Sequence, residues 1–338
     1  MKRTRLLGLV MAVMVAASLS TGLTAAASAA SLTGAGSTLM TPLMAKWTAD
    51  YQGLTGNSVT YGSVGSGAGI TQITNRTVDF GASDAPLTAA QAAACNNCKE
   101  IPWALTATAI AINIPGIRKL NLSPGVLAAI YLGEIKNWND PQIAKLNKGV
   151  TLPNLAITPV YRSDGSGDTY AFTDLLSQAS STWKRLVGNA TSVSFPVGKG
   201  GAKNDGVTAL VTSTPGALAY IAASYVIAHS LNAAALQNRA GKFAYPNLKN
   251  IAAAAAAFPK VPANEEMHIV YPPKKAKSAY PLSTYSYAIV PATPNQTALV
   301  QNFISYAIGR GQSLGATLDF APLPKAVVRA DTAAVAAL

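Results

Sequence analysis

Apolar residues along this chain repeat with two different spacings, and these spacings alternate from one segment to the next. Four apolar side chains lie three or four residues apart on one helical face: Leu43, Trp47, Tyr51 and Leu54. The run from Val59 to Tyr61 then predicts a strand, and alternation at Ile110, Ile112 and Ile114 predicts another. Because alternating strands and helices are typical of parallel sheets covered by helices, the pattern predicts an α/β fold.

The chain carries neither an internal repeat nor a Pro/Ser-rich linker, so any lobes are expected to be joined by sheet strands. The candidate crossing strands are residues 108–114 and 283–290. We expect residues 30–107 and 283–338 to form the first lobe and residues 108–282 to form the second. A ligand is then expected in the cleft between them.

The first 29 residues have the pattern of a signal peptide. Lys2, Arg3 and Arg5 precede an apolar run over residues 6–17, and residues 27–29 read Ala-Ser-Ala, a small-x-small cleavage site. No second apolar run is long enough to span a bilayer, and no cysteine near the cleavage site offers a lipid anchor. We expect a soluble mature protein that is periplasmic or secreted.

The composition is that of a globular protein with an excess of positive charge. Apolar residues make up 49% of the 338 positions, and 26 basic residues face 14 acidic ones. Without the three cations of the signal peptide the net charge is still +9. The lysines and arginines are scattered in sequence and not interleaved with aromatic residues, so no nucleic-acid partner is expected and small anions are the simpler partners.

Two cysteines, Cys95 and Cys98, lie three residues apart. In an oxidising compartment this spacing favours a small-loop disulfide, with a redox-active pair as the alternative. A metal site is not expected because the chain has no further cysteine, and His229 and His268 are remote in sequence.

The segment Arg162-Ser163-Asp164-Gly165-Ser166-Gly167-Asp168-Thr169 carries the clearest chemistry. Residues 157–161 predict a strand before it, and apolar residues at helical spacing follow it. The amides at a helix N-terminus lack intrahelical partners and the helix dipole is positive there, so this turn with its arginine favours an anion.

Two further Gly/Ser turns precede predicted helices, Gly34-Ala35-Gly36-Ser37-Thr38-Leu39 and Gly65-Ser66-Gly67-Ala68-Gly69. Glycines let backbone amides approach a ligand, and Ser66 adds a hydroxyl. Each turn alone is compatible with a plain connection between elements.

Asp84 places a carboxylate in a fourth segment, Asp79-Phe80-Gly81-Ala82-Ser83-Asp84-Ala85-Pro86. A fully ionised anion is repelled by an aspartate in a poorly hydrated cleft, but a ligand that still carries a proton can donate it to the carboxylate. Hydrogen phosphate has such a proton near neutral pH and sulfate has none. The alternative is that Asp84 only caps the turn before Pro86.

These four segments, in this order, resemble the periplasmic phosphate-binding proteins of bacterial high-affinity phosphate ABC transporters, which are type II periplasmic binding proteins. The resemblance continues through residues 130–138, 204–206 and 215–220 and is weakest over 252–279. It implies a two-lobed fold, in which each lobe is a mostly parallel sheet flanked by helices and two crossing strands join the lobes.

The resemblance also implies a ligand set for phosphate, carried over position by position: Thr38, Leu39, Ser66, Asp84, Arg162, Ser166 and Gly167. Leu39 stands where phenylalanine is common, but only its amide is used. Ser37 and Thr169 are expected to support the site, and Asp164 is expected to hold Arg162.

Asp168 departs from the family pattern, since many members have threonine there as a further donor. As a second carboxylate near the ligand it would accept a second proton and favour dihydrogen phosphate. The alternative is that Asp168 caps its helix while Thr169 supplies the hydroxyl.

The expected function is capture of inorganic phosphate by closure of the lobes, followed by delivery to the permease subunits of an ABC transporter. We expect a monomer without a cofactor. An enzyme such as a secreted phosphatase is the weaker alternative, because the two histidines are expected to lack any nearby carboxylate or nucleophile motif. A binder of another tetrahedral oxyanion, arsenate, is the second alternative.

Overall fold

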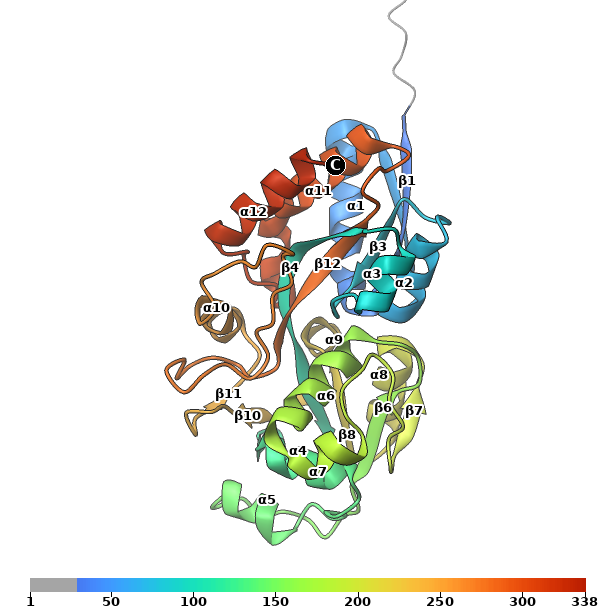
Figure 1. The fold of residues 1–338 in the computed structure, drawn as a ribbon. Helices are drawn as coiled ribbons and strands as arrows, with labels where there is room; N and C mark the ends of the chain where they lie inside the picture. Colours follow the sequence, from blue (N-terminus) through green and yellow to red (C-terminus); the bar gives the residue numbers. More distant parts are fainter. Residues whose placement is uncertain (1–28) are drawn as a thin grey trace, which may run out of the picture.

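The computed structural model describes residues 29–338, and Figure 1 shows two lobes, one above the other. The expected signal peptide, apart from its last residue, lies outside the described part. Within residues 29–338 no helix combines the length and apolar character that crossing a membrane requires.

One long mixed sheet runs through both lobes in the order β2-β1-β3-β12-β4-β8-β6-β7. The strands of its upper part are β1 (Ser31–Gly36), β2 (Ser58–Ser63), β3 (Phe80–Ser83) and β12 (Ser283–Val290). Those of its lower part are β6 (Thr158–Arg162), β7 (Lys199–Gly201), β8 (Ala217–Ala222) and the short β9 (Asn232–Ala233), which pairs with β4.

Strand β4 (Lys99–Asn113) belongs to both parts of the sheet. Residues 99–107 pair antiparallel with β12, and residues 108–113 pair antiparallel with β8. The strand therefore begins nine residues before the expected Thr108 and crosses between the lobes without a break. In the long sheet, parallel pairing is confined to three strands in each lobe, β2-β1-β3 and β7-β6-β8. Strands β12 and β4 between them pair antiparallel with their neighbours.

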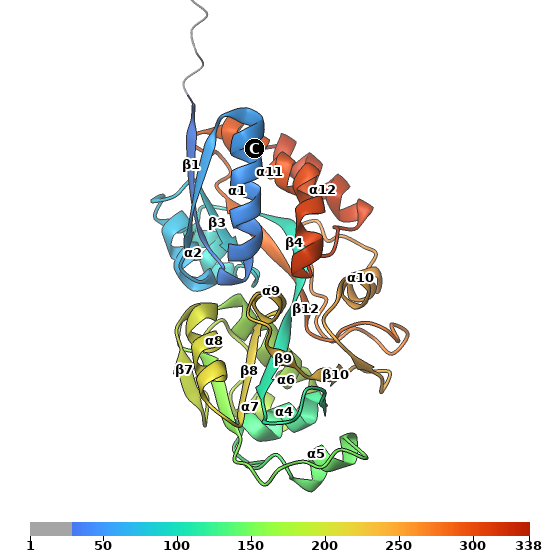
Figure 2. The ribbon, with the colours of Figure 1, turned by 180° about the vertical axis from the view of Figure 1, so that it is seen from behind.

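Helices cover both parts of the sheet, as Figures 1 and 2 show from opposite sides. The upper helices are α1 (Thr41–Thr55), α2 (Ser66–Thr74), α3 (Ala89–Ala94), α11 (Thr297–Ile308), α12 (Lys325–Ala336) and the 3-10 segments η1 (Thr38–Met40) and η2 (Arg310–Leu318). The lower ones are α4 (Pro124–Tyr131), α5 (Pro141–Leu146), α6 (Gly167–Ala179), α7 (Ser181–Leu186), α8 (Lys203–Ser213) and α9 (Ala223–Ala228). Helix α10 (Leu248–Ala256) lies beside β4 and β12, where the two lobes meet. A small sheet, β11-β10-β5, adds β5 (Asn121–Leu122), β10 (Ala235–Gln237) and β11 (Phe243–Ala244).

Each lobe packs around its own aromatic cluster. In the upper lobe the rings of Trp47 and Trp103 meet edge to face at 5.5 Å, and in the lower lobe Phe172 stacks on Tyr220 at 4.4 Å. The predicted face of α1 buries its first three apolar residues, but Leu54 is 50% exposed because the helix ends beside solvent. The buried apolar residues of the two lobes form one continuous cluster, which includes residues of β4 from Ile101 to Ile112.

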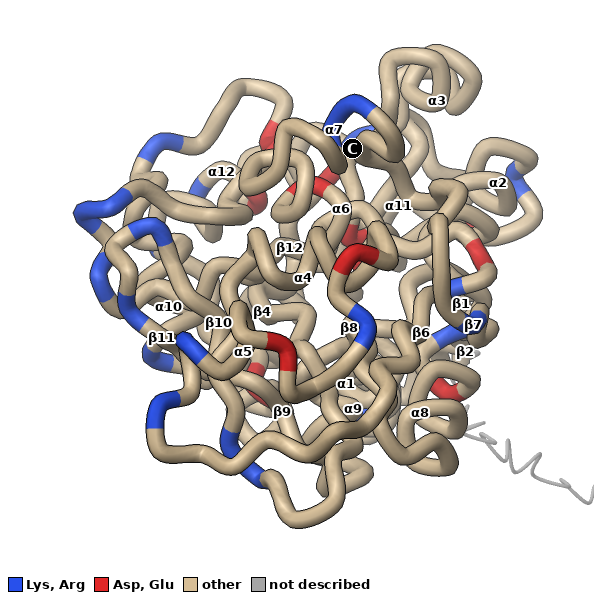
Figure 3. The backbone as a smooth tube through the Cα atoms, turned by 90° about the horizontal axis from the view of Figure 1, so that it is seen from below, with Lys and Arg blue, Asp and Glu red and all other residues tan. Residues whose placement is uncertain are grey.

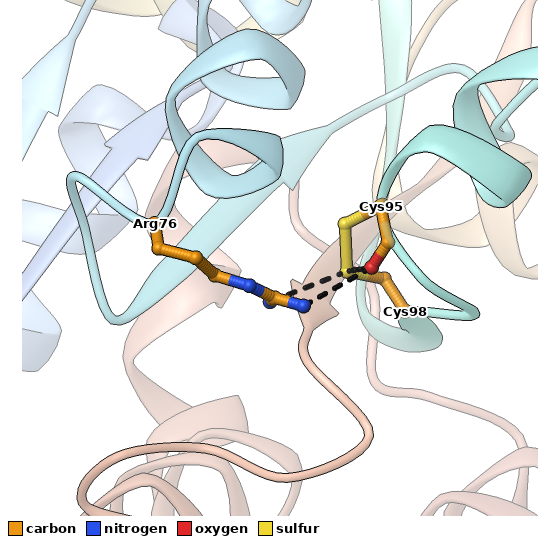
Figure 4. The surroundings of a disulfide bond; sticks show 3 residues. All are labelled: Arg76, Cys95 and Cys98. Atoms are coloured by element: carbon orange, nitrogen blue, oxygen red, sulfur yellow. Dashed lines mark hydrogen bonds between the residues drawn. A yellow bond between two sulfur atoms is a disulfide. The ribbon is translucent and has the colours of Figure 1, made fainter.

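Cys95 and Cys98 form a disulfide, as expected, just after α3. Arg76 donates to the carbonyl of Cys95 at 3.1 Å and approaches the sulfur of Cys98 at 3.8 Å (Figure 4). The disulfide loop is thus tied to the end of α2.

A pair of carboxyl groups, Glu265 and Asp331, ties the long segment after α10 to helix α12 of the upper lobe. Asp331 is fully buried, and neither its oxygens nor Glu265 Oε2 receive a donor within residues 29–338. Burial, then the neighbouring Glu265, raises the pKa of Asp331 to about 9. We infer that a proton held between the two carboxyls supplies the missing donor.

This pair predicts a stability that falls as pH rises. An unfolded aspartate loses its proton near pH 4, whereas folded Asp331 keeps it up to about pH 9, so its contribution is full below about pH 4 and is lost by about pH 9. We expect Asp331→Asn, which keeps a donor at every pH, to raise stability by about 1 kcal/mol or more at pH 8. Thermal unfolding from pH 5 to 9 measures this.

The exposed Asp205→Asn serves as the control and is expected to run parallel to the wild type over the same pH range. An Asp331→Asn variant whose melting curve also runs parallel to the wild type contradicts the shared proton.

Candidate functional site

The three Gly/Ser turns meet between the two lobes, where segments from both sides exchange hydrogen bonds. The amide of Gly67 donates to Gly165 O at 3.0 Å, and the amide of Gly167 donates to Ser66 Oγ at 3.1 Å. Parallel strands β1 and β3 end at this edge of the upper lobe and β6 ends at the facing edge, so their following turns converge. This is the crevice in which open α/β sheets bind ligands.

Glycine is required where the lobes touch. A Cβ on Gly167 would lie 2.4 Å from Cβ of Asp84, and a Cβ on Gly67 would lie 3.2 Å from Cα of Gly165. Larger residues would hold the two turns apart, which explains the glycines of the sequence motifs in physical terms.

Arg162, at the end of β6, is the buried cation of the cleft. Its Nε and Nη2 donate to the two oxygens of Asp164 at 2.8 and 2.5 Å, the expected bidentate pair. Burial lowers the pKa of Arg162, but the bonds to Asp164 and the charge of Asp168 outweigh it and raise the pKa above its ordinary value. Asp164 is fixed in turn by the amide of Lys203 at 2.8 Å.

Asp84, directly after β3, is 2% exposed. Its Oδ2 accepts a hydrogen bond from Ser37 Oγ, while its Oδ1 is buried and receives no donor within the described part of the chain. Burial and then the charge of Asp168 raise the pKa of Asp84 to about 7, against the hydroxyls of Ser37 and Ser286 and the charge of Arg162. A buried acceptor atom that lacks a donor is what a proton-carrying ligand requires.

Asp168 lies in the first turn of α6 and is 1% exposed. Oδ1 accepts from Thr108 Oγ1 at 2.6 Å, and Oδ2 accepts from Asn204 Nδ2 at 3.0 Å and Arg162 Nη1 at 3.3 Å. Burial is the largest influence on Asp168 and raises its pKa, although Arg162 and these hydrogen bonds oppose the shift.

The capping role considered for Asp168 is wrong. Ser166 is the N-cap of α6 and accepts from the amide of Thr169 at 3.4 Å. The Thr169 hydroxyl pairs with Tyr220 OH at 2.8 Å, so it is already engaged inside the lower lobe. Asp168 is free of a cap role because a serine two residues earlier has taken it.

Thr38 and Leu39 lie in the 3-10 turn η1, after Ser37, and both are buried. Ser37 Oγ accepts from the Leu39 amide at 3.1 Å, and thus links this turn to Asp84. The structure therefore gathers every predicted ligand and supporting residue at one place between the lobes, while the disulfide of Cys95 and Cys98 lies apart from them.

Three residues of this cluster had no role in the sequence-based prediction: Thr108, Asn204 and Tyr220. Asn204 is fully buried, and its Nδ2 bridges Thr38 Oγ1 at 2.8 Å and Asp168 while its Oδ1 accepts from the Ala222 amide at 3.1 Å. The signals for Asn204 and Tyr220 were their places in the resembling segments 204–206 and 215–220. Thr108 lies within a strand and carries no local signal.

The site contains three carboxyls and one guanidinium, so opposite charge alone does not attract an anion into it. The starts of α2 and α6 also lie at this site, where helix amides lack intrahelical partners and the helix dipole is positive.

A family model described as a PBP superfamily domain matches residues 23–310. Phosphate-binding protein PstS of Pasteurella multocida is 39% identical over 306 residues, covering 89% of this chain and 88% of that protein. Its counterpart in Haemophilus influenzae is 37% identical over 307 residues, covering 89% and 91%. The chain belongs to the family of phosphate-binding proteins.

Solved structures show the same two-lobed fold. A high-affinity periplasmic phosphate-binding protein with bound phosphate superimposes with a TM-score of 0.72 at 22% identity, covering 88% of this chain and 92% of that one. A putative phosphate ABC transporter substrate-binding protein of Clostridium perfringens, also with bound phosphate, gives 0.65 at 19% identity, covering 87% and 100%. The expected two-lobed fold is thereby confirmed.

The bridge made by Asn204 predicts a loss of stability on truncation. Asn204→Ala removes a donor from buried Thr38 and Asp168 and an acceptor from the Ala222 amide, so we expect a loss of about 1–3 kcal/mol in the free energy of unfolding. Chemical denaturation measures it. Thr208→Val, one turn later on α8, removes a bond only to the Asn204 carbonyl and is expected to cost less than about 1 kcal/mol. Equal losses in the two variants would contradict the bridge.

Proposed function

We propose that this protein captures inorganic phosphate between its lobes and delivers it to an ABC transporter. The observation that carries the proposal is the buried Asp84 Oδ1, which has no donor within residues 29–338 and lies in a cluster of amides and one guanidinium. The relatives named for phosphate binding support the same ligand.

Phosphate fits this combination of donors and acceptors better than sulfate does. Amides and Arg162 satisfy its ionised oxygens, and its proton goes to Asp84. Sulfate has no proton near neutral pH, so an oxygen would face the carboxylate unpaired and with like charge. The selectivity follows from a group that repels the wrong anion.

The proposed phosphate ligands come from both lobes: Thr38, Leu39, Ser66, Asp84, Arg162, Ser166, Gly167 and Asp168. Ser37, Asp164 and Thr169 support them. Ser37 fixes Asp84, Asp164 fixes Arg162, and Thr169 ties the start of α6 to Tyr220. Donors from separate lobes make closure and binding one event.

We assign residues 30–107 and 283–338 to the first lobe and residues 108–282 to the second, with bending at β4 and at the segment before β12. This division places the change of pairing partner at Thr108 beside the bend. The mature protein then acts as an extracytoplasmic monomer that docks on permease subunits in the membrane.

Binding without turnover is part of the proposal. The expectation that neither histidine has a carboxylate neighbour is wrong for His268, whose Nε2 lies 2.6 Å from Asp174 Oδ2. No serine, threonine or cysteine side chain bonds to that ring among the described residues, so the pair lacks the nucleophile that hydrolysis by this route requires.

Calorimetry on protein stripped of ligand tests the proposal. We expect orthophosphate to bind at one site per chain and sulfate at the same concentration to give no heat beyond dilution. Arsenate, which matches phosphate in shape and protonation, is added as a competitor to measure how far the site separates the two. Absence of orthophosphate binding, or equal affinity for sulfate, rejects the proposed function.

Asp168 predicts a distinct pH dependence of phosphate affinity. Its Oδ1 accepts one hydrogen bond and keeps a lone pair for a second ligand proton. At alkaline pH free phosphate carries a single proton, so a complex in which the bound phosphate carries two protons must take up one more proton from solution. Affinity should then fall by up to about tenfold per pH unit between about pH 7 and 9. Asp168→Thr, which offers no second acceptor carboxylate, is expected to show a flatter profile. Identical profiles would exclude this role.

A further inference from the structure

The cations that are scattered in sequence are gathered by the fold on one side of the lower lobe. Figure 3 shows Lys and Arg concentrated along the side that carries α5, β10, β11 and α10, while Asp and Glu lie mostly elsewhere. We define the basic face as residues 118–119, 145–150, 239–249 and 274–277. These segments contain ten lysines and arginines, all exposed, and no aspartate or glutamate.

Hydrogen bonds hold the four segments together, so the basic face is a fixed feature of the fold. The small sheet β11-β10-β5 joins residues 239–249 to β5, which follows residues 118–119 closely in the chain. Asn147 and Asn121 exchange bonds at 2.8 and 2.9 Å, and Asn238 donates to the carbonyl of Lys277 at 3.0 Å. Ten like charges on one side then produce a field that reaches about a Debye length into solvent.

Apolar side chains are exposed within the same face. Val150, Phe243 and Tyr245 are 37%, 36% and 38% exposed, and they are three of the six large apolar residues exposed in the described part of the chain. Tyr245 and Val150 line a hollow of about 470 Å³ together with Lys119, Lys145 and Lys148. Cations and aromatic rings side by side are the combination found where proteins rest on the headgroup region of a membrane.

The predominance of lysine over arginine on the basic face favours a membrane over other anionic partners. Eight of the ten are lysines. Of the two arginines, Arg239 is already occupied, since it donates to Tyr271 O at 2.9 Å and Gln178 Oε1 at 2.6 Å. Lysine acts as a mobile point charge and suits a diffuse anionic surface, whereas specific binding to nucleic-acid phosphates favours free arginine forks.

We propose that the basic face binds peripherally to an anionic phospholipid bilayer, with lysines on the headgroups and Phe243 and Tyr245 in the interfacial layer. Such attachment would hold the phosphate-binding protein near a membrane while leaving the interlobe cleft open to solution. The cleft and the face use different residues, so either property can be lost without the other.

Co-sedimentation with vesicles of phosphatidylcholine, with and without phosphatidylglycerol, tests the proposal on the mature protein. We expect binding only to the anionic vesicles at low salt, and its loss as salt is raised and the Debye length shortens. The triple change Lys242→Glu, Lys274→Glu, Lys277→Glu is expected to weaken binding by at least about tenfold. The matched triple change Lys184→Glu, Arg185→Glu, Lys199→Glu alters three exposed cations on α7 and β7, outside the face, and is expected to change binding by about twofold or less.

Phe243→Ser with Tyr245→Ser separates a bilayer from a soluble polyanion. We expect this double variant to bind anionic vesicles more weakly and heparin unchanged, because only a bilayer offers an apolar layer to the two rings. Phosphate calorimetry on each variant should match the wild type and shows that the variants are folded. Equal loss from both charge-reversal triples, equal binding to neutral vesicles, or binding to heparin but not to vesicles would overturn the proposal.

Discussion

The structure of the cleft depends on how three carboxyl groups, of which Asp84 and Asp168 are buried, are stabilised around one guanidinium. Asp164 is neutralised directly by Arg162, with which it forms two hydrogen bonds. Asp84 and Asp168 lie so close together that the charge of Asp168 raises the pKa of Asp84. Taking unpaired carboxylates out of water is costly, so each must find donors or keep a proton. Asp168 has three donors, whereas Asp84 Oδ1 has none within the described residues. That difference is the reason for proposing Asp84 as the group that distinguishes a protonated ligand from a fully ionised one.

The hydrogen bonds that cross the cleft depend on how the two lobes are placed relative to each other, and so on closure of the cleft. Asn204, on the lower lobe, donates across the cleft to Thr38 and at the same time to Asp168, and the Ser66 hydroxyl accepts from Gly167 on the opposite side. Each of these bonds requires that the two edges meet at the right separation. The glycines at positions 67, 165 and 167 permit that separation, and β4 allows it by carrying one unbroken strand through both lobes.

Short-range patterns were enough to locate the Gly/Ser turns and the strands and helices beside them, because a turn between a strand and a helix is a local feature. The full set of proposed ligands came from the family resemblance. The segment 162–169 illustrates this, with strand, turn and helix in the predicted order. The roles of Thr108, Asn204 and Tyr220 were missed because each depends on a partner between 51 and 166 residues away. The alternative that Asp168 caps α6 is wrong because Ser166, also a good capping residue, is the N-cap, and only the backbone geometry decides between them. The basic face was likewise invisible in sequence, since its four segments are joined only by the small sheet and side-chain bonds.

The buried acids and the basic surface are two aspects of one charge distribution. Asp84, Asp168 and Asp331 are each at most 2% exposed, so these carboxyls contribute little to the field at the surface, whereas the ten cations of the basic face are all exposed. Each buried carboxyl that keeps its proton also removes one negative charge from the formal balance. The pKa values of about 7 for Asp84 and about 9 for Asp331 mean that this happens at neutral or mildly acidic pH. With these protons bound, the net charge of the protein is more positive than its sequence composition states. The same protons that stabilise the interior thus strengthen the attraction of the surface for anions.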